Sequence, residues 1–314
     1  MKVTPDPTTY LYMIRAAASK GDPEGAADWL KRMSEKGLQV WVPHFHAVMK
    51  AHANLGDMEG TEAWFRVMLD EGIRPDLVSF NILMSAAANC GDVTGAEGVL
   101  LRMEDVEVAP DVVTYSTLLS AFAKAGKAIE ARNWLIRAEE EGIEPDLNCY
   151  KQVIKACANS GQAELAERMT RRALRNRLTL DVYTYNMLLN AMAKKGEWSS
   201  AEFWVDHMQR SARWKHAEFP LDQISVAYSE VLLAHVEGGD EKGAEEWLMQ
   251  MLGEGIEPQA RCYTALVQRY LDLGELDAAR QWLDRMTAWS NHRTPQNLLK
   301  AVQPERLLQS AVSS

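Results

Sequence analysis

The segment from Ala109 to Leu135, APDVVTYSTLLSAFAKAGKAIEARNWL, predicts two helices joined by a tight turn. Pro110 ends the preceding helix, and the carboxylate of Asp111 can cap the next one by accepting a backbone N–H. Apolar side chains then fall at i, i+3, i+4 and i+7 from Tyr115, which places them on one face of the first helix. Gly126 stands where a left-handed residue is needed to leave that helix, and the second helix follows it.

The same pattern recurs along the chain at a fixed period of 35 residues, interrupted by a single offset of 43. The turn glycines are Gly21, Gly56, Gly91, Gly126, Gly161, Gly196, Gly239 and Gly274. The aromatic residues eleven positions before them are Tyr10, Phe45, Phe80, Tyr115, Tyr150, Tyr185, Tyr228 and Tyr263. The small residues five positions after them are Ala26, Thr61, Ala96, Ala131, Ala166, Ala201, Ala244 and Ala279. Three positions further on, tryptophan recurs as Trp29, Trp64, Trp134, Trp204, Trp247 and Trp282.

These eight units, numbered repeats 1 to 8, predict one repeat array over residues 7–295. Two antiparallel helices of this size bury too little surface alone, so the units must stack on their neighbours. The sequence therefore predicts an all-α fold, a right-handed α-solenoid, in which the small residues let helices approach and the tryptophans lie in the core. We expect residues 1–6 to be a lead-in and residues 296–314 to form a capping helix and tail. The extra residues are expected to be an insertion around 209–224.

Composition excludes several classes of function. The chain of 314 residues carries a net charge of -10, which argues against non-specific attraction to phosphate backbones. No stretch of 18 apolar residues predicts membrane insertion, and the first residues show no targeting segment. The four cysteines lack metal-ligand spacing and are expected to be buried thiols. No nucleophile elbow, phosphate-binding loop or dinucleotide-binding motif occurs, so we expect no enzyme activity, cofactor, metal or small-molecule substrate.

The 35-residue period, the aromatic residue and the junctions IRPDLVSFN, VAPDVVTYS, IEPDLNCYK and IEPQARCYT resemble the pentatricopeptide repeat family. The resemblance implies binding of single-stranded RNA, one nucleotide per repeat, in a mitochondrion or plastid. In that family a base is read by the residue after the aromatic together with the residue at the Pro-Asp junction, and apolar residues of adjacent repeats sandwich it. Members that cut or edit RNA carry an added C-terminal domain, for which the residues after repeat 8 are too few.

Carried over position by position, the resemblance implies the following sites. The base-reading candidates are Asn81 with Asp111, a pairing used for uracil, Ser116 with Asp146, a pairing used for guanine, and Asn186 with Asp222 or Ile224. The base-sandwiching candidates are Val78 and Val113, and the candidates for contact with the RNA backbone are Lys124 and Lys194. Other repeats depart from the pattern, since His46 with Asp76 is not a standard pair.

A second interpretation stays open beside RNA binding. Only two of the eight positions that precede the turn glycine by two residues are basic, and the last two are Glu237 and Asp272. With the acidic balance, this also fits a scaffold that binds protein partners within a larger organellar assembly. A functional insertion would act through its basic residues Arg210, Arg213, Lys215 and His216; the alternative is a longer second helix with a solvated end.

Overall fold

The computed structural model describes residues 6–211 and 221–289, and within these ranges every regular element is an α-helix. No β-strand occurs in the described residues, so the prediction of an all-α fold built from helix pairs is confirmed. The helices are α1 (Pro7–Ser19), α2 (Pro23–Glu35), α3 (Val42–Asn54), α4 (Met58–Asp70), α5 (Leu77–Cys90), α6 (Val93–Asp105), α7 (Val112–Lys124), α8 (Ala128–Glu140), α9 (Leu147–Ser160), α10 (Ala163–Arg175), α11 (Val182–Ala193), α12 (Trp198–Arg210), α14 (Leu221–Gly238), α15 (Glu241–Gly253), α16 (Ala260–Asp272) and α17 (Leu276–Trp289).

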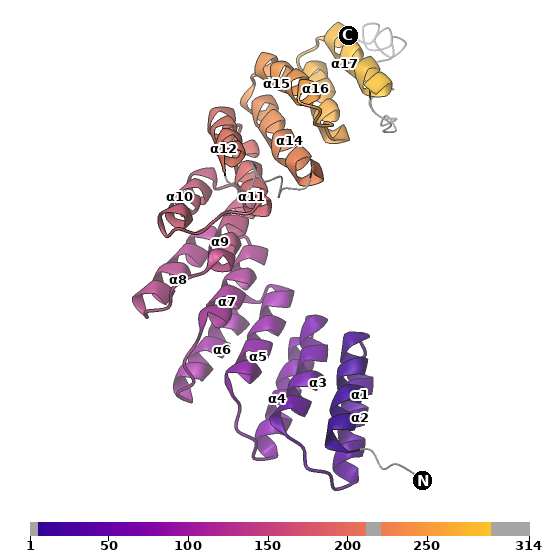
Figure 1. Cartoon of the computed structure of the whole chain (residues 1–314), viewed down its shortest axis with the longest axis vertical. Helices are drawn as coiled ribbons and strands as arrows, with labels where there is room; N and C mark the ends of the chain where they lie inside the picture. Colours follow the sequence, from indigo (N-terminus) through magenta and orange to yellow (C-terminus); the bar gives the residue numbers. More distant parts are fainter. Residues whose placement is uncertain (1–5, 212–220, 290–314) are drawn as a thin grey trace, which may run out of the picture. The chain divides into compact units, whose positions relative to one another are not determined.

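The helices group into two compact blocks, an N-terminal block (Met1–Ser160) and a C-terminal block (Gly161–Ser314). Within the N-terminal block the first helix of each repeat packs on the first helix of the next, so that α1, α3, α5, α7 and α9 form one continuous layer (Figure 1). Each second helix packs on its own first helix and on the next one, as α4 does on α3 and α5. The C-terminal block repeats this scheme, with α14 against both α11 and α16.

The turn chemistry expected from the sequence is present in the structure. All eight turn glycines have φ between 66° and 80°, a left-handed conformation that residues with a Cβ rarely adopt. Aspartates begin several first helices. The carboxylate of Asp76 accepts the N–H of Ser79 at 2.9 Å, and that of Asp111 accepts the N–H of Thr114 at 2.8 Å. These caps fix where each first helix starts and therefore the register of the residues that follow.

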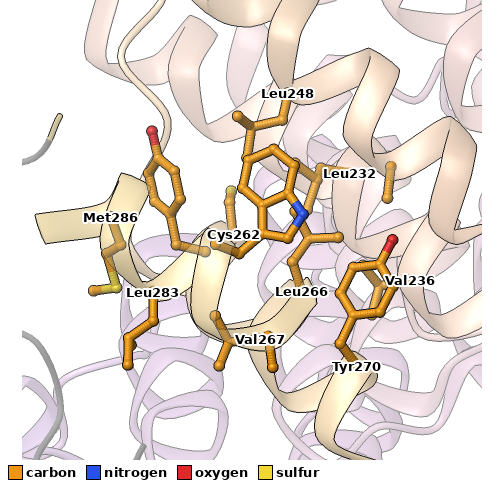
Figure 2. Close-up of a cluster of buried hydrophobic side chains, with 13 residues drawn as sticks. Leu232, Val236, Leu248, Cys262, Leu266, Val267, Tyr270, Leu283 and Met286 are labelled. Atoms are coloured by element: carbon orange, nitrogen blue, oxygen red, sulfur yellow. The ribbon is translucent and has the colours of Figure 1, made fainter. Parts of the chain in front are cut away.

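The periodic aromatic and small residues form the core, as predicted. The eight small residues are each 0% exposed, and none of the eight aromatic side chains exceeds 3%. In the C-terminal block they contribute to a cluster made by α14, α15, α16 and α17, in which Leu232, Leu248, Leu266 and Leu283 converge (Figure 2). One prediction about cysteines is wrong: Cys90 is exposed at the end of α5, whereas the other three thiols are buried.

The tryptophan stripe is only partly core. Trp204 and Trp282 are buried, at 1% and 2% exposure, whereas the other four periodic tryptophans are half-buried. The prediction that the stripe is core therefore holds for two positions. The second helices form the outer layer, and only one side of an outer helix faces a neighbouring layer.

The insertion does not lengthen a second helix. Helix α12 has 13 residues and ends at Arg210, as long as α10, whereas α14 has 18 and begins at Leu221. The last insertion residues therefore extend a first helix, and Ile224 is buried there. Arg210 pairs with Asp206 at 2.8 Å. The other basic residues of the insertion, at positions 213, 215 and 216, and the expected capping helix at 296–314 lie outside the described residues.

Candidate nucleic-acid interface

A groove of about 740 Å³ runs over the first helices of the N-terminal block. Residues of α1, α3, α5 and α7 line it, so it crosses repeats 1 to 4 in chain order. Its lining consists of Arg15, Ala18, Ser19, Pro43, His46, Ala47, Lys50, Ala53, Asn54, Val78, Asn81, Ile82, Ser85, Val113 and Thr117. No Asp or Glu is among them, although the chain has a net charge of -10.

The charge of the groove comes from Arg15 and Lys50. Both precede the turn glycine of their repeat by six residues, about one helical turn before the position that Lys124 and Lys194 hold in their repeats. Residues four apart on a helix share a face, so the earlier position also points along the inner layer. The recurrence of a basic residue at that register was visible in the sequence, but only the groove shows that this register lines an open surface.

The two lysines assigned to the RNA backbone do not line this groove. Lys124 Nζ donates to the main-chain oxygen of Asn89 at 3.1 Å and to its Oδ1 at 3.3 Å. Asn89 Nδ2 in turn donates to the main-chain oxygen of Ala53 at 2.8 Å. In these repeats the position therefore ties the ends of adjacent first helices together. Lys194 follows α11 as its C-cap residue in the C-terminal block.

The structure brings Asn81 and Asp111 together. Asn81 Nδ2 donates to Asp111 Oδ1 at 3.5 Å, and the Thr114 hydroxyl donates to Asn81 Oδ1 at 2.7 Å. Burial acts to raise the pKa of Asp111, but hydrogen bonds from Thr114 and Asn81 outweigh it and lower that pKa, so the carboxylate stays ionised. These contacts orient the amide of Asn81, which lines the groove, and Asp111 uses only one of its two N–H donors.

The other two predicted base-reading pairs are not joined. Ser116 is 7% exposed and donates to the main-chain oxygen of Val113 at 3.2 Å; no hydrogen bond links it to Asp146 within the described ranges. Asp146 accepts the N–H of Cys149 at 2.9 Å. Asn186 Nδ2 donates to the main-chain oxygen of Gln223 at 3.2 Å, so neither Asp222 nor Ile224 provides its partner.

The reason in the case of Asn186 is the early start of α14. With residues from 221 onward already helical, the backbone of Gln223 occupies the place that a junction side chain has in the shorter repeats. The side-chain oxygen of Asn186 is buried and has no hydrogen-bond partner among the described residues.

His46 occupies the register of Asn81 in the preceding repeat and lines the same groove. Its Nε2 lies 3.1 Å from Asp76 Oδ1 and 2.8 Å from Ser79 Oγ. Burial lowers the pKa of His46 and outweighs the nearby carboxylate, so the ring is neutral at neutral pH. Val78 on α5 and Val113 on α7 also line the groove, and their exposures of 50% and 51% leave both side chains open to a ligand.

Two kinds of site have no support in the described part of the chain. No group of three or more His, Cys, Asp or Glu side chains there is placed to hold a metal ion. None of the described helices combines the length and apolarity that crossing a bilayer requires.

Family models for pentatricopeptide repeats match most of the chain. A pentatricopeptide repeat domain matches residues 64–125 and 135–195, and a model for pentatricopeptide repeat-containing proteins matches 8–86. Two further repeat models match 110–159, and 183–211 with 261–289. No curated protein sequence matches the chain significantly.

Solved structures of the same fold are similar to the chain. The pentatricopeptide repeat protein PPR10, a maize protein, in complex with an 18-nt psaJ RNA element is 19% identical, with a TM-score of 0.53 over 92% of this chain and 46% of that one. A cysteine-substituted form of that complex gives the same values. Nuclear proteinaceous RNase P 2 from A. thaliana is 18% identical, with a TM-score of 0.44 over 54% and 38%. The chain thus spans about half the length of PPR10.

Proposed function

Because the chain belongs to the pentatricopeptide repeat family, we propose that it binds single-stranded RNA along the inner faces of its first helices. The observation that carries the proposal is the groove over α1, α3, α5 and α7, whose charged lining is entirely positive in an acidic chain. PPR10, of similar fold, was solved with an RNA element bound. The transcripts would be those of a mitochondrion or plastid, and the protein would act on their stability, processing or translation.

The groove supplies the three kinds of contact that a single strand requires. Arg15 and Lys50 offer charge to phosphates, and Val78 and Val113 offer half-exposed apolar surface on which a base can lie. Asn81 offers an oriented N–H donor to a base edge. These residues bind and orient a strand but break no bond, so the proposed role is recognition rather than catalysis.

The reading site of Asn81 and Asp111 supports a preference for uracil in repeat 3, since the family uses this pairing for that base. Ser116 with Asp146 has no such geometric support, because the serine hydroxyl already donates to the backbone. The proposal therefore places sequence discrimination at one repeat of the groove. A strand bound across repeats 1 to 4 would otherwise be held by charge and stacking.

The proposal is tested with a 5′-labelled, unstructured RNA of about twelve nucleotides, by fluorescence anisotropy at several salt concentrations. The test variant combines Arg15→Ala with Lys50→Ala. The control combines Lys31→Ala with Arg66→Ala, which removes the same charge from the second helices α2 and α4. Loss of two phosphate contacts should reduce the slope of log affinity against log salt by about 1.4, at about 0.7 per phosphate.

A slope of 1.4 corresponds to about 25-fold in affinity at 0.1 M relative to 1 M salt, so the effect is measurable. The control variant should retain the slope of the parent protein, because its charges lie outside the groove. Equal losses in both variants, or no RNA binding at low salt, would refute RNA binding by this surface.

A further inference from the structure

Three tryptophans of the second helices have similar surroundings, although the arginine comes from the tryptophan's own helix at Trp134 and Trp282 and from the preceding second helix, α10, at Trp204. The indole Nε1 donates to a glutamate of the preceding second helix, and an arginine guanidinium lies over the ring, a favourable cation–π geometry. Trp134 Nε1 lies 3.1 Å from Glu97 Oε1, and Arg137 Cζ lies 4.8 Å from the centroid of its ring. The corresponding distances are 3.4 and 5.3 Å for Trp204 with Glu167 and Arg171. For Trp282 with Glu245 and Arg285 they are 2.6 and 4.5 Å.

Trp247 of repeat 7 lacks this arrangement. Its Nε1 donates to the main-chain oxygen of Tyr228 at 3.0 Å, because the glutamate in the equivalent position, Glu202, lies 3.0 Å from His235 Nε2. No cation lies over its ring among the described residues. The sequence explains the loss: three residues after the tryptophan, where Trp134 and Trp282 have arginine, Trp247 has Gln250.

A pocket of about 390 Å³ lies between α12 and α15 beside Trp247. A pocket beside Trp134, which Arg137 lines, is smaller, at about 210 Å³. Trp247 forms one wall, Gln250 lies beside it, and the carboxylates of Glu202, Asp206 and Glu246 supply the charge. Asp206 pairs with the exposed Arg210, whereas Glu246 makes no hydrogen bond or ion pair with any described residue. Among the described residues, no basic side chain lines the pocket.

Trp64 shows what happens when the whole arrangement is lost. It also lacks an overlying cation in the described structure, with Val67 three residues later, but the preceding helix has Ala27 in place of the glutamate. The equivalent acid and cation are therefore absent together there. In repeat 7 three carboxylates line the pocket and no basic side chain of the described residues does, so the pocket has the chemistry of a guanidinium site without a cation in the described part of the chain.

We propose that this pocket receives an arginine side chain from a basic segment of a protein partner. The guanidinium would lie over the ring of Trp247, as Arg137 and Arg285 do over theirs, with the Glu246 carboxylate accepting its N–H groups. Arginine fits better than lysine because it is planar, stacks on aromatic rings and donates two parallel hydrogen bonds to one carboxylate.

The site is separate from the proposed RNA groove. It lies on second helices of the C-terminal block, and its charge repels phosphate. The inference therefore goes beyond RNA binding and does not depend on it.

The test uses the full chain, ¹⁵N-labelled, and follows the indole N–H signal of Trp247 by NMR, identified from its loss in Trp247→Phe. The probe is a blocked Gly-Gly-Arg-Gly-Gly peptide, with the same peptide containing citrulline, which is isosteric and uncharged, as the control. The arginine peptide should shift the signal saturably, and Glu246→Gln should weaken its binding at least fivefold, in line with the loss of a charge-assisted hydrogen bond.

Gln250→Arg provides the sharpest variant, because it supplies from within the chain the cation that other repeats already have. It should abolish peptide binding and raise the thermal midpoint, while RNA affinity stays unchanged. Val67→Arg is its matched control, because it adds the same residue three positions after Trp64. The preceding helix has Ala27 there instead of a glutamate, so this variant should raise the thermal midpoint less.

Equal shifts with the arginine and citrulline peptides would overturn the proposal, as would undiminished peptide binding by Gln250→Arg. Tighter binding of free L-arginine than of the peptide would also overturn it, because the ligand would then be the amino acid rather than a protein. Should Gln250→Arg fail to fold, Glu246→Gln decides alone: unchanged peptide affinity in that variant refutes the site.

Discussion

Replacing Gly196 by alanine should destabilise the C-terminal block far more than the same change at Gly126 destabilises the N-terminal block. The two glycines hold equivalent positions in their repeats and have nearly the same conformation, with φ of 66° and 67°. A Cβ on Gly126 would have nothing within 4 Å, whereas a Cβ on Gly196 would lie 2.6 Å from both the Cα and the N of Gly238. The neighbour is backbone, which cannot rotate away as a side chain can.

The magnitudes follow from this geometry. Gly126→Ala should lower the free energy of unfolding by roughly 1–2 kcal/mol, because it places a Cβ on a residue in the left-handed conformation. Gly196→Ala has the same cost, and its Cβ must also push apart two packed turns, which lowers the free energy of unfolding by about 1–3 kcal/mol more. The expected loss is therefore about 2–5 kcal/mol, at least 1 kcal/mol above that of the control.

Urea unfolding followed by far-ultraviolet circular dichroism measures both losses, and amide hydrogen exchange locates them. Because arrays of repeats can unfold in stages, exchange in α11, α12 and α14 should be compared with exchange in α7 and α8. Equal losses for the two variants would refute the reasoning, since the close approach of Gly196 and Gly238 would then carry no energetic weight.

Four further results are expected. Trp204→Ala should cost about 3–5 kcal/mol of unfolding free energy in urea melts and Trp134→Ala about 1–2, because only the former side chain is fully buried; equal costs would contradict this. Because the pKa of His46 is lowered in the folded protein, the unfolded chain takes up this proton at a higher pH than the folded chain does. The free energy of unfolding should therefore fall below about pH 6.5, by at most about 1.4 kcal/mol per pH unit. Urea midpoints at about pH 7.5 and 5.5 measure this fall, which His46→Gln should reduce. A thiol reagent should label Cys90 rapidly and the three buried thiols only on unfolding, which a Cys90→Ser variant checks. If RNA is bound, Asn81→Ala should remove a preference for U over other bases worth about 1–3 kcal/mol in competition titrations, and unchanged discrimination would exclude this residue as the reader.

Sequence periodicity was sufficient to predict most of the fold. One position of the repeat is aromatic in all eight units and another is small in all eight, which indicates that each unit packs in the same environment. All sixteen residues at these two positions are buried. The turn glycines are equally local, because a left-handed residue at a helix end is a property of one peptide unit. The pairing of Asn81 with Asp111 was expected from the family resemblance rather than from the period, and it joins α5 to the start of α7 in the next repeat.

Other features depended on neighbours that the period does not specify. Contacts between adjacent repeats decide how far each tryptophan is buried. They also include the hydrogen bond from Lys124 to Asn89 and the contact of His235 with Glu202. One substitution in the facing helix changes each of them, while the repeat pattern stays the same.

The sequence by itself determined an array of helix pairs, because spacing alone fixes which residues a helix turns inward and where it must end. Only the tertiary structure decided which surfaces remain open. Arg15 and Lys50 line a groove because the first helices of the N-terminal block form one continuous layer. Trp247 borders a pocket lined by carboxylates, and His235, from a different helix, engages the glutamate that its indole would otherwise contact. Helix formation is local along the chain, whereas exposure is a property of the packed assembly of helices.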